Sequence, residues 1–185
     1  GTFSMPYNGS YGWNPYTCRS MENQAVMQMI YQGLFTLNQS FDAEPVLCKD
    51  FSVSGDGLTY TITLQSAWFS NGSALTAADV TYSLSQAQQS ELYSERFTDI
   101  SSYEAVDSGT VAIYLSQPND RLPCLLNFPI IRDGSSPNGS PQGTGPFVRN
   151  GDVLSLDQNW WQGAERVQFQ TATLCSSTSA EDTRD

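Results

Sequence analysis

The side chains that most often perform catalysis are missing or dispersed in this chain. It contains no histidine, which removes the commonest general base, the histidine-activated serine and cysteine nucleophiles, and most zinc sites. Its 19 acidic residues are scattered, and no pair of carboxylates is spaced as the acid and base of a hydrolase. We therefore expect no enzyme, no metal and no cofactor.

Cysteine chemistry is open to two interpretations. The four cysteines form no C-x-x-C pair, so a zinc or redox motif has no support. In an exported protein an even number permits two disulfides with three possible pairings, and small free thiols are the alternative. The residues concerned are Cys18, Cys48, Cys124 and Cys175.

Charge and composition restrict the partners. The formal net charge is −11, and a field of that sign repels phosphate backbones, so we expect no nucleic acid partner. A hydrophobic fraction of 39% supports a folded core, and the low charged fraction of 15% is typical of secreted or surface proteins. No run approaches the roughly 20 apolar residues of a membrane helix.

The elements that must position any site begin with an aromatic loop. Residues 2–5 are predicted as a strand, and the loop 7–16 that follows is rich in aromatic side chains. Ser20 is a predicted helix N-cap, and Gly33 is predicted to end that helix. Its buried face is predicted from apolar residues at helical spacing, Ala25, Val26, Met29 and Ile30.

Short strands dominate the rest of the chain, with one longer helix. Residues 58–64 alternate apolar and polar side chains after a turn at 54–57, which predicts a hairpin. Thr76 and Asp79 form an acidic capping box at the start of a helix reaching about residue 89, with Ala77, Val80, Leu84 and Ala87 inward. Further predictions are a strand 34–37, a turn 41–45, a hairpin 103–115, a short helix 121–127, a loop 132–145, and strands 147–150, 153–157 and 166–174. Few helices among many strands predict an α+β fold.

Six motifs then occur in a specific order. They are Tyr31 to Phe35, Glu44 to Leu47, Phe51 to Leu64, Trp68 to Val80, Gly143 to Phe147, and Asn159 to Trp161. Each motif alone is weak, but together they resemble the family 5 extracellular solute-binding proteins, receptors for oligopeptides, dipeptides and nickel. The resemblance covers nearly the whole chain, from about residue 14 to residue 182.

The resemblance implies an architecture and a role. The expected fold is a mixed β-sheet lobe with a few helices, the first lobe of a periplasmic-binding-protein-like fold of type II, cluster C. Residues 1–175 would form part of lobe I, and the tail 176–185 would lie at the crossing to an absent lobe II. Such a receptor captures a peptide or nickel complex outside the cytoplasm, at the cell surface as a lipoprotein or in the periplasm. It would deliver this ligand to the permease of an ABC importer, as a monomer tethered through a lipid anchor that this sequence lacks.

Ligand contacts are expected from three segments that the resemblance identifies. Aromatic side chains would give stacking surface, Asn127 would bond a peptide main chain, and Arg96 or Arg19 would meet a carboxylate. Core packing is the alternative for the aromatics, a solvated surface for the arginines, and a disulfide for Cys18; Trp160 and Trp161 are expected to be a packing anchor. The expected contacts are Trp13, Tyr16, Cys18, Arg19, Tyr93, Arg96, Asn127 and Phe128.

Two rival functions remain at the level of the sequence. The aromatic, Asn-rich composition would also suit a carbohydrate-binding module of a secreted hydrolase, although two amphipathic helices argue against a simple β-sandwich. A sensory receptor on the same scaffold would bind ligand with the same chemistry as a transport receptor. In either receptor the chain alone is expected to bind weakly, because half of the burial surface is missing.

Overall fold

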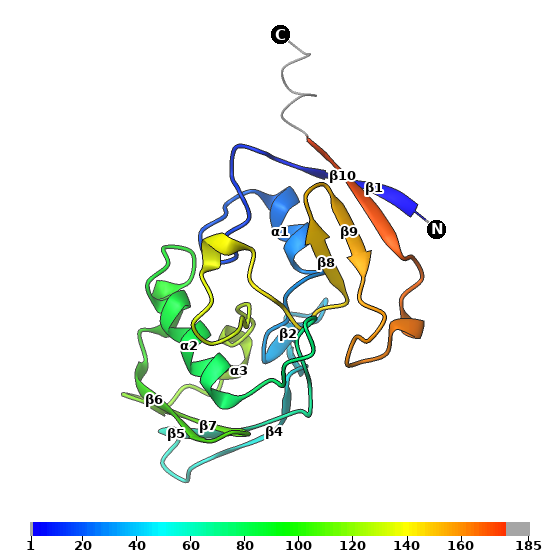
Figure 1. The fold of residues 1–185 in the computed structure, drawn as a ribbon. Helices are drawn as coiled ribbons and strands as arrows, with labels where there is room; N and C mark the ends of the chain where they lie inside the picture. Colours follow the sequence, from blue (N-terminus) through cyan, green and yellow to red (C-terminus); the bar gives the residue numbers. More distant parts are fainter. Residues whose placement is uncertain (1, 177–185) are drawn as a thin grey trace.

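Two four-stranded sheets lie at opposite ends of the structure, which is a computed structural model describing residues 2–176 (Figure 1). One sheet has the order β1-β10-β9-β8, and β1 pairs in parallel with β10, whereas the other pairs are antiparallel. This sheet therefore joins the two ends of the described chain. Its strands are β1 (Thr2–Tyr7), β8 (Phe147–Asn150), β9 (Val153–Leu156) and β10 (Thr171–Ser176).

The other large sheet is antiparallel throughout and has the order β4-β5-β7-β6. Along β5 the side chains of Tyr60, Ile62 and Leu64 are buried in alternation with partly exposed threonines, as the period-two pattern predicts. A two-stranded sheet of β2 (Phe35–Leu37) and β3 (Ala43–Pro45) stands apart from it. The large sheet consists of β4 (Cys48–Val53), β5 (Thr59–Leu64), β6 (Ile100–Asp107) and β7 (Thr110–Leu115).

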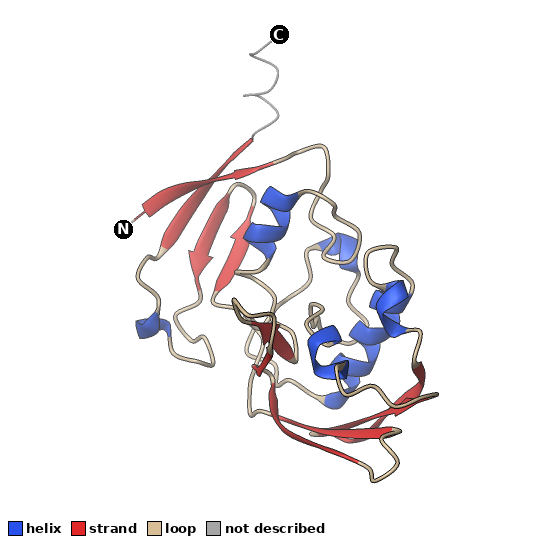
Figure 2. Cartoon of the chain, turned by 180° about the vertical axis from the view of Figure 1, so that it is seen from behind, coloured by secondary structure: helices blue, strands red, loops and turns tan. Residues whose placement is uncertain are grey.

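Helices fill the space between the two large sheets (Figure 2). In α2 (Ala77–Gln88) the predicted inward residues Ala77, Val80, Leu84 and Ala87 are all buried, and α2 packs against β6 and β7. The Asp79 carboxylate accepts from the Thr76 backbone N–H at 2.7 Å and from the Asp133 backbone N–H at 2.8 Å. The capping residue therefore also fixes a distant loop. The shorter helical segments are α1 (Met21–Met27), α3 (Leu122–Leu125), and the 3-10 turns Ser94–Phe97, Pro137–Gly139 and Ala164–Arg166.

Several local predictions were wrong. In α1 the Ser20 cap is confirmed, but Ala25 is exposed and Met27 occupies the buried face beside Val26. Residues 41–45 contain β3 because they pair with β2. The last strand begins at Thr171, since residues 164–166 form a 3-10 turn. Of the expected tail 176–185, Ser176 ends β10 and the remainder lies outside the described residues.

A connector of residues 29–34 links the separate parts of the fold. Its backbone carbonyls accept from Phe147 (to Met29 O, 3.0 Å), Gly145 (to Ile30 O, 2.9 Å) and Ile130 (to Gln32 O, 2.9 Å). Val46 bonds to Leu34 O at 2.9 Å. The connector thus binds β8, the loop before it, the segment after α3 and the start of β4.

Glycines allow the neighbouring chains to approach this connector. A Cβ on Gly143 would lie 2.1 Å from the Ile30 carbonyl oxygen, and one on Gly33 would lie 2.8 Å from the backbone of Asn127. Gly33 does not end the helix as predicted, because α1 already ends at Met27. The absence of a side chain at Gly33 instead leaves room for the backbone of Asn127, in the segment after α3. A Cβ on Gly145 would likewise lie 2.7 Å from the backbone of Ile30.

Replacing Gly143 with alanine tests this packing. We expect Gly143→Ala to lower the free energy of unfolding by about 1–3 kcal/mol, the usual cost of overpacking a rigid site. Gly55→Ala is the matched control, since its Cβ would meet nothing within 4 Å, and it should be neutral or stabilise by up to about 1 kcal/mol. Denaturant unfolding measures both, and equal effects would contradict the contact with Ile30.

Candidate ligand-binding site

Two pockets lie on either side of Met27 and Tyr31, which line both. We call them the Arg96 pocket, of about 220 Å³, and the Arg149 pocket, of about 180 Å³. The remaining residues of the Arg96 pocket are Pro15, Gln24, Gln28, Gln32, Gly33, Tyr93, Arg96, Asn127 and Pro129. Three of the expected contact residues therefore meet in one place.

The guanidinium of Arg96 is held by neutral groups. Its Nη1 donates to Asn127 Oδ1 at 2.5 Å, and its central carbon lies 4.7 Å from the ring centroid of Tyr93. Among residues 2–176 the single ion pair joins Arg19 to Glu91, so no described carboxylate neutralises Arg96. Arg96 retains its charge for a ligand, and a planar guanidinium suits a carboxylate.

Tyr93 remains a neutral phenol at physiological pH. Burial raises the pKa of Tyr93, and the nearby Arg96 opposes that shift only in part. The ring therefore offers a face for stacking and a hydroxyl that can donate or accept.

Buried contacts behind the pocket position these side chains. Tyr16 is 2% exposed, packs its ring edge-on to Tyr93 at 6.3 Å, and donates from its hydroxyl to Pro129 O at 2.6 Å. Burial raises the pKa of Tyr16 well above its ordinary value, which keeps the hydroxyl a donor. The Ser90 hydroxyl donates to the Tyr16 carbonyl and fixes the start of the segment that carries Tyr93.

The other expected contacts lie elsewhere. Phe128 is fully buried and packs edge-on against Phe97 at 5.5 Å, so it belongs to the core of the described residues. Cys18 is also buried, and all four cysteines have free thiols. Arg19 is on the surface, 3.0 Å from Glu91, and Trp13 lines the Arg149 pocket. The contact role of each expected residue stays a prediction.

Three glutamines of the pocket were missed by the sequence analysis. Gln24 lies in α1, Gln28 is the residue that caps its end, and Gln32 lies in the connector of residues 29–34. The spacing of four residues between Gln24 and Gln28 was a usable signal for these two side chains. Gln32 is fixed further, because its Oε1 accepts from Thr144 Oγ1 and from Trp161 Nε1, both at 2.9 Å.

Of the expected packing anchor, Trp161 packs against the hydrophobic core, and the indole N–H groups of Trp160 and Trp161 are both hydrogen-bonded. The Trp160 indole N–H donates to Thr144 O at 2.8 Å, beside the bond from Trp161 to Gln32.

In residues 2–176 no helix is long and apolar enough to span a membrane, and no group of acidic or cysteine side chains is arranged to hold a metal ion.

Comparison with protein families identifies the fold's relatives. Residues 42–171 match the model of the bacterial extracellular solute-binding proteins, family 5 Middle, which is more than half of the chain. The chain belongs to this family. Family 5 consists of solute-binding proteins rather than enzymes, so membership favours a receptor over a carbohydrate-binding module.

Curated relatives of this family 5 chain include glutathione-binding proteins. GsiB of Salmonella typhi is 35% identical over 147 residues, covering 72% of this chain and 29% of the relative. GsiB of Escherichia coli O157:H7 is 32% identical over the same length. This family 5 chain therefore spans less than a third of the length of these relatives.

Solved structures confirm the expected α+β, periplasmic-binding-protein-like fold of this family 5 chain. MoaA of A. tumefaciens R10, in complex with mannopinic acid, aligns with a TM-score of 0.82 at 24% identity, over 98% of this chain and 42% of that one. NikZ of Campylobacter jejuni, in complex with Ni(L-His), aligns with a TM-score of 0.77 at 22% identity, over 99% and 41%. At these identities the likeness concerns the fold alone.

Removing the Tyr16 hydroxyl tests whether its hydrogen bond to Pro129 O stabilises the fold behind the Arg96 pocket. We expect Tyr16→Phe to lower the free energy of unfolding by about 0.5–1.5 kcal/mol, because the partly buried hydrogen bond from Tyr16 to Pro129 O is lost. Tyr11→Phe is the control, since Tyr11 is 53% exposed and should change stability by less than about 0.5 kcal/mol. Thermal unfolding of both variants is the measurement, and equal losses would exclude the hydrogen bond to Pro129 O as the cause.

Proposed function

We propose that this chain supplies one wall of the solute site of an extracytoplasmic receptor, which captures a carboxylate-bearing ligand such as a peptide and passes it to the permease of an ABC importer. The observation that carries the proposal is the Arg96 pocket, where a guanidinium without a carboxylate partner meets an aromatic face and an amide. A nickel complex with amino-acid ligands would present carboxylates of the same kind.

Each side chain of this pocket has a distinct role in the proposal. Arg96 binds the ligand carboxylate, Tyr93 packs against its apolar parts, and Asn127 uses its amide N–H groups on a backbone carbonyl. The bond that Asn127 makes through Oδ1 to Arg96 leaves its amide nitrogen available. Gln24 and Gln28 add further neutral donors and acceptors at the rim.

The site would be closed by a second lobe. The described residues enclose the Arg96 pocket only in part, and the chain covers 42% of the MoaA structure. In a two-lobed receptor the ligand is buried when the lobes close by a hinge. The receptor would act without catalysis, as a monomer outside the cytoplasm that is tethered to the membrane through a lipid anchor.

Binding to the longer receptor that includes this chain tests the role of Arg96. Glutathione, dipeptides and nickel–histidine are the probes, and calorimetry gives the dissociation constant of each. We expect Arg96→Met to weaken binding of the preferred probe by about 10- to 100-fold, the loss of a charge-assisted hydrogen bond. Arg166→Met, a change at an exposed arginine, is the matched control and should leave affinity unchanged.

The chain of 185 residues should bind the same probe weakly or not at all, because the opposing wall is missing. Tight binding by this chain alone would contradict the two-lobed site. Unchanged affinity in the Arg96 variant of the receptor would contradict the assignment of the ligand to this pocket.

A further inference from the structure

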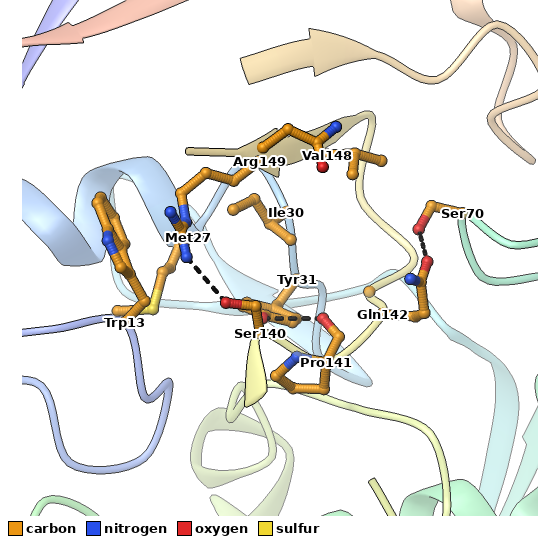
Figure 3. A pocket seen from close by; sticks show the side chains of 12 residues that line it. Trp13, Met27, Ile30, Tyr31, Ser70, Ser140, Pro141, Gln142, Val148 and Arg149 are labelled. Atoms are coloured by element: carbon orange, nitrogen blue, oxygen red, sulfur yellow. Dashed lines mark hydrogen bonds between the residues drawn. The ribbon is translucent and has the colours of Figure 1, made fainter. Parts of the chain in front are cut away.

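Arg149 occupies the second pocket in an arrangement similar to that of Arg96. It lies in β8, and its guanidinium carbon is 4.6 Å from the ring centroid of Trp13. Trp13 in turn stacks on Tyr7 at 5.4 Å. Figure 3 shows Arg149 and Trp13 at one side of the pocket and the bonded pair Ser70 and Gln142 at the other.

The cation of Arg149 has no ion-pair partner within the described residues. Its Nη1 donates to Gly151 O at 2.9 Å and its Nη2 to Ser140 Oγ at 2.8 Å, so two of its five N–H groups are used and three remain. Burial lowers the pKa of Arg149, which indicates a guanidinium partly removed from water. The nearby Asp152 accepts from the Tyr7 hydroxyl at 3.2 Å and stays outside ion-pair distance of Arg149.

Neutral donors also line this pocket. Gln142 accepts from the Ser70 hydroxyl through Oε1, and its amide nitrogen has no partner among the described residues. The amide of Asn150, which also lines this pocket, is likewise unpaired there. Apolar side chains of Met27, Ile30 and Val148 complete the lining.

We propose that the Arg149 pocket binds a small monocarboxylate, with the carboxylate on Arg149 and a short apolar tail against the apolar lining of Met27, Ile30 and Val148. A single charge is favoured over a phosphate dianion, because the net charge of −11 repels a second negative charge more strongly. The site is separate from the Arg96 pocket, since Met27 and Tyr31 stand between the two.

A purely structural role for Arg149 predicts something different. Its bond to Ser140, a residue with φ of 52°, ties the loop after the Pro137–Gly139 turn to β8. If Arg149 were only such a tie, Ser140→Ala would loosen the loop and no carboxylate would bind. In the proposed site Ser140→Ala removes one of the groups that orient Arg149 but leaves its charge and its bond to Gly151 O, so binding weakens less than in Arg149→Met.

Fluorine NMR of the 185-residue chain tests the site with 4,4,4-trifluorobutyrate as the probe. We expect line broadening of the probe that butyrate competes away, and no broadening of the neutral 4,4,4-trifluorobutyramide. Arg149→Met should weaken binding about tenfold or more. The matched Arg96→Met should bind as the parent chain does, and Ser140→Ala should lose less affinity than Arg149→Met, with circular dichroism confirming that each variant is folded.

Three outcomes would overturn the proposal. They are the absence of broadening in the parent chain, equal broadening in Arg149→Met, and loss of broadening in Arg96→Met while Arg149→Met retains it. The last result would place the carboxylate in the Arg96 pocket and would support the function proposed above. Loss of binding in Arg149→Met with Arg96→Met unaffected supports the separate site whatever the ligand of the receptor is.

Discussion

The backbone of residues 29–34 is the constraint on which the rest of the structure depends. Its carbonyl groups accept hydrogen bonds from β8, from the loop before β8, from the segment after α3 and from the start of β4. These partners are distant in the sequence, so the connector holds together parts that share no sheet. Such bonds require main chains in direct contact, which is why Gly33, Gly143 and Gly145 stand where a Cβ would collide with backbone.

The connector of residues 29–34 sets the geometry of both pockets. Tyr31 lies in it, lines both pockets, and donates from its hydroxyl to Pro141 O at 3.0 Å. On one side Gly33 brings the backbone of Asn127 close, and on the other the bonds to Gly145 and Phe147 place Arg149 on β8. Side chains fixed in this way lose little further freedom when a ligand binds, which favours affinity.

Features encoded by neighbouring residues were predictable from the sequence, and features that depend on distant contacts were not. The alternation along residues 58–64 and the capping pair Thr76 and Asp79 are local patterns, and the structure confirms both. Tyr93, Arg96 and Asn127 were named through a family resemblance and do meet in one pocket. Trp13 was grouped with them, but the fully buried Asn23 bonds to Asn8 and Gly12 and directs that loop to the other pocket. No local sequence pattern predicted that Trp13 would line the Arg149 pocket.

The neutral groups that hold Arg96 and Arg149 connect the fold to ligand binding. The sequence has 19 acidic residues and 8 basic ones, so a partly buried arginine could readily have been paired with a carboxylate. Arg96 and Arg149 are instead fixed by neutral acceptors, Asn127 Oδ1 and Ser140 Oγ, and by aromatic faces. Such partners set the direction of a guanidinium without cancelling its charge, whereas an ion pair would do both. In an acidic protein this arrangement keeps two localised positive charges available to an anion from solution.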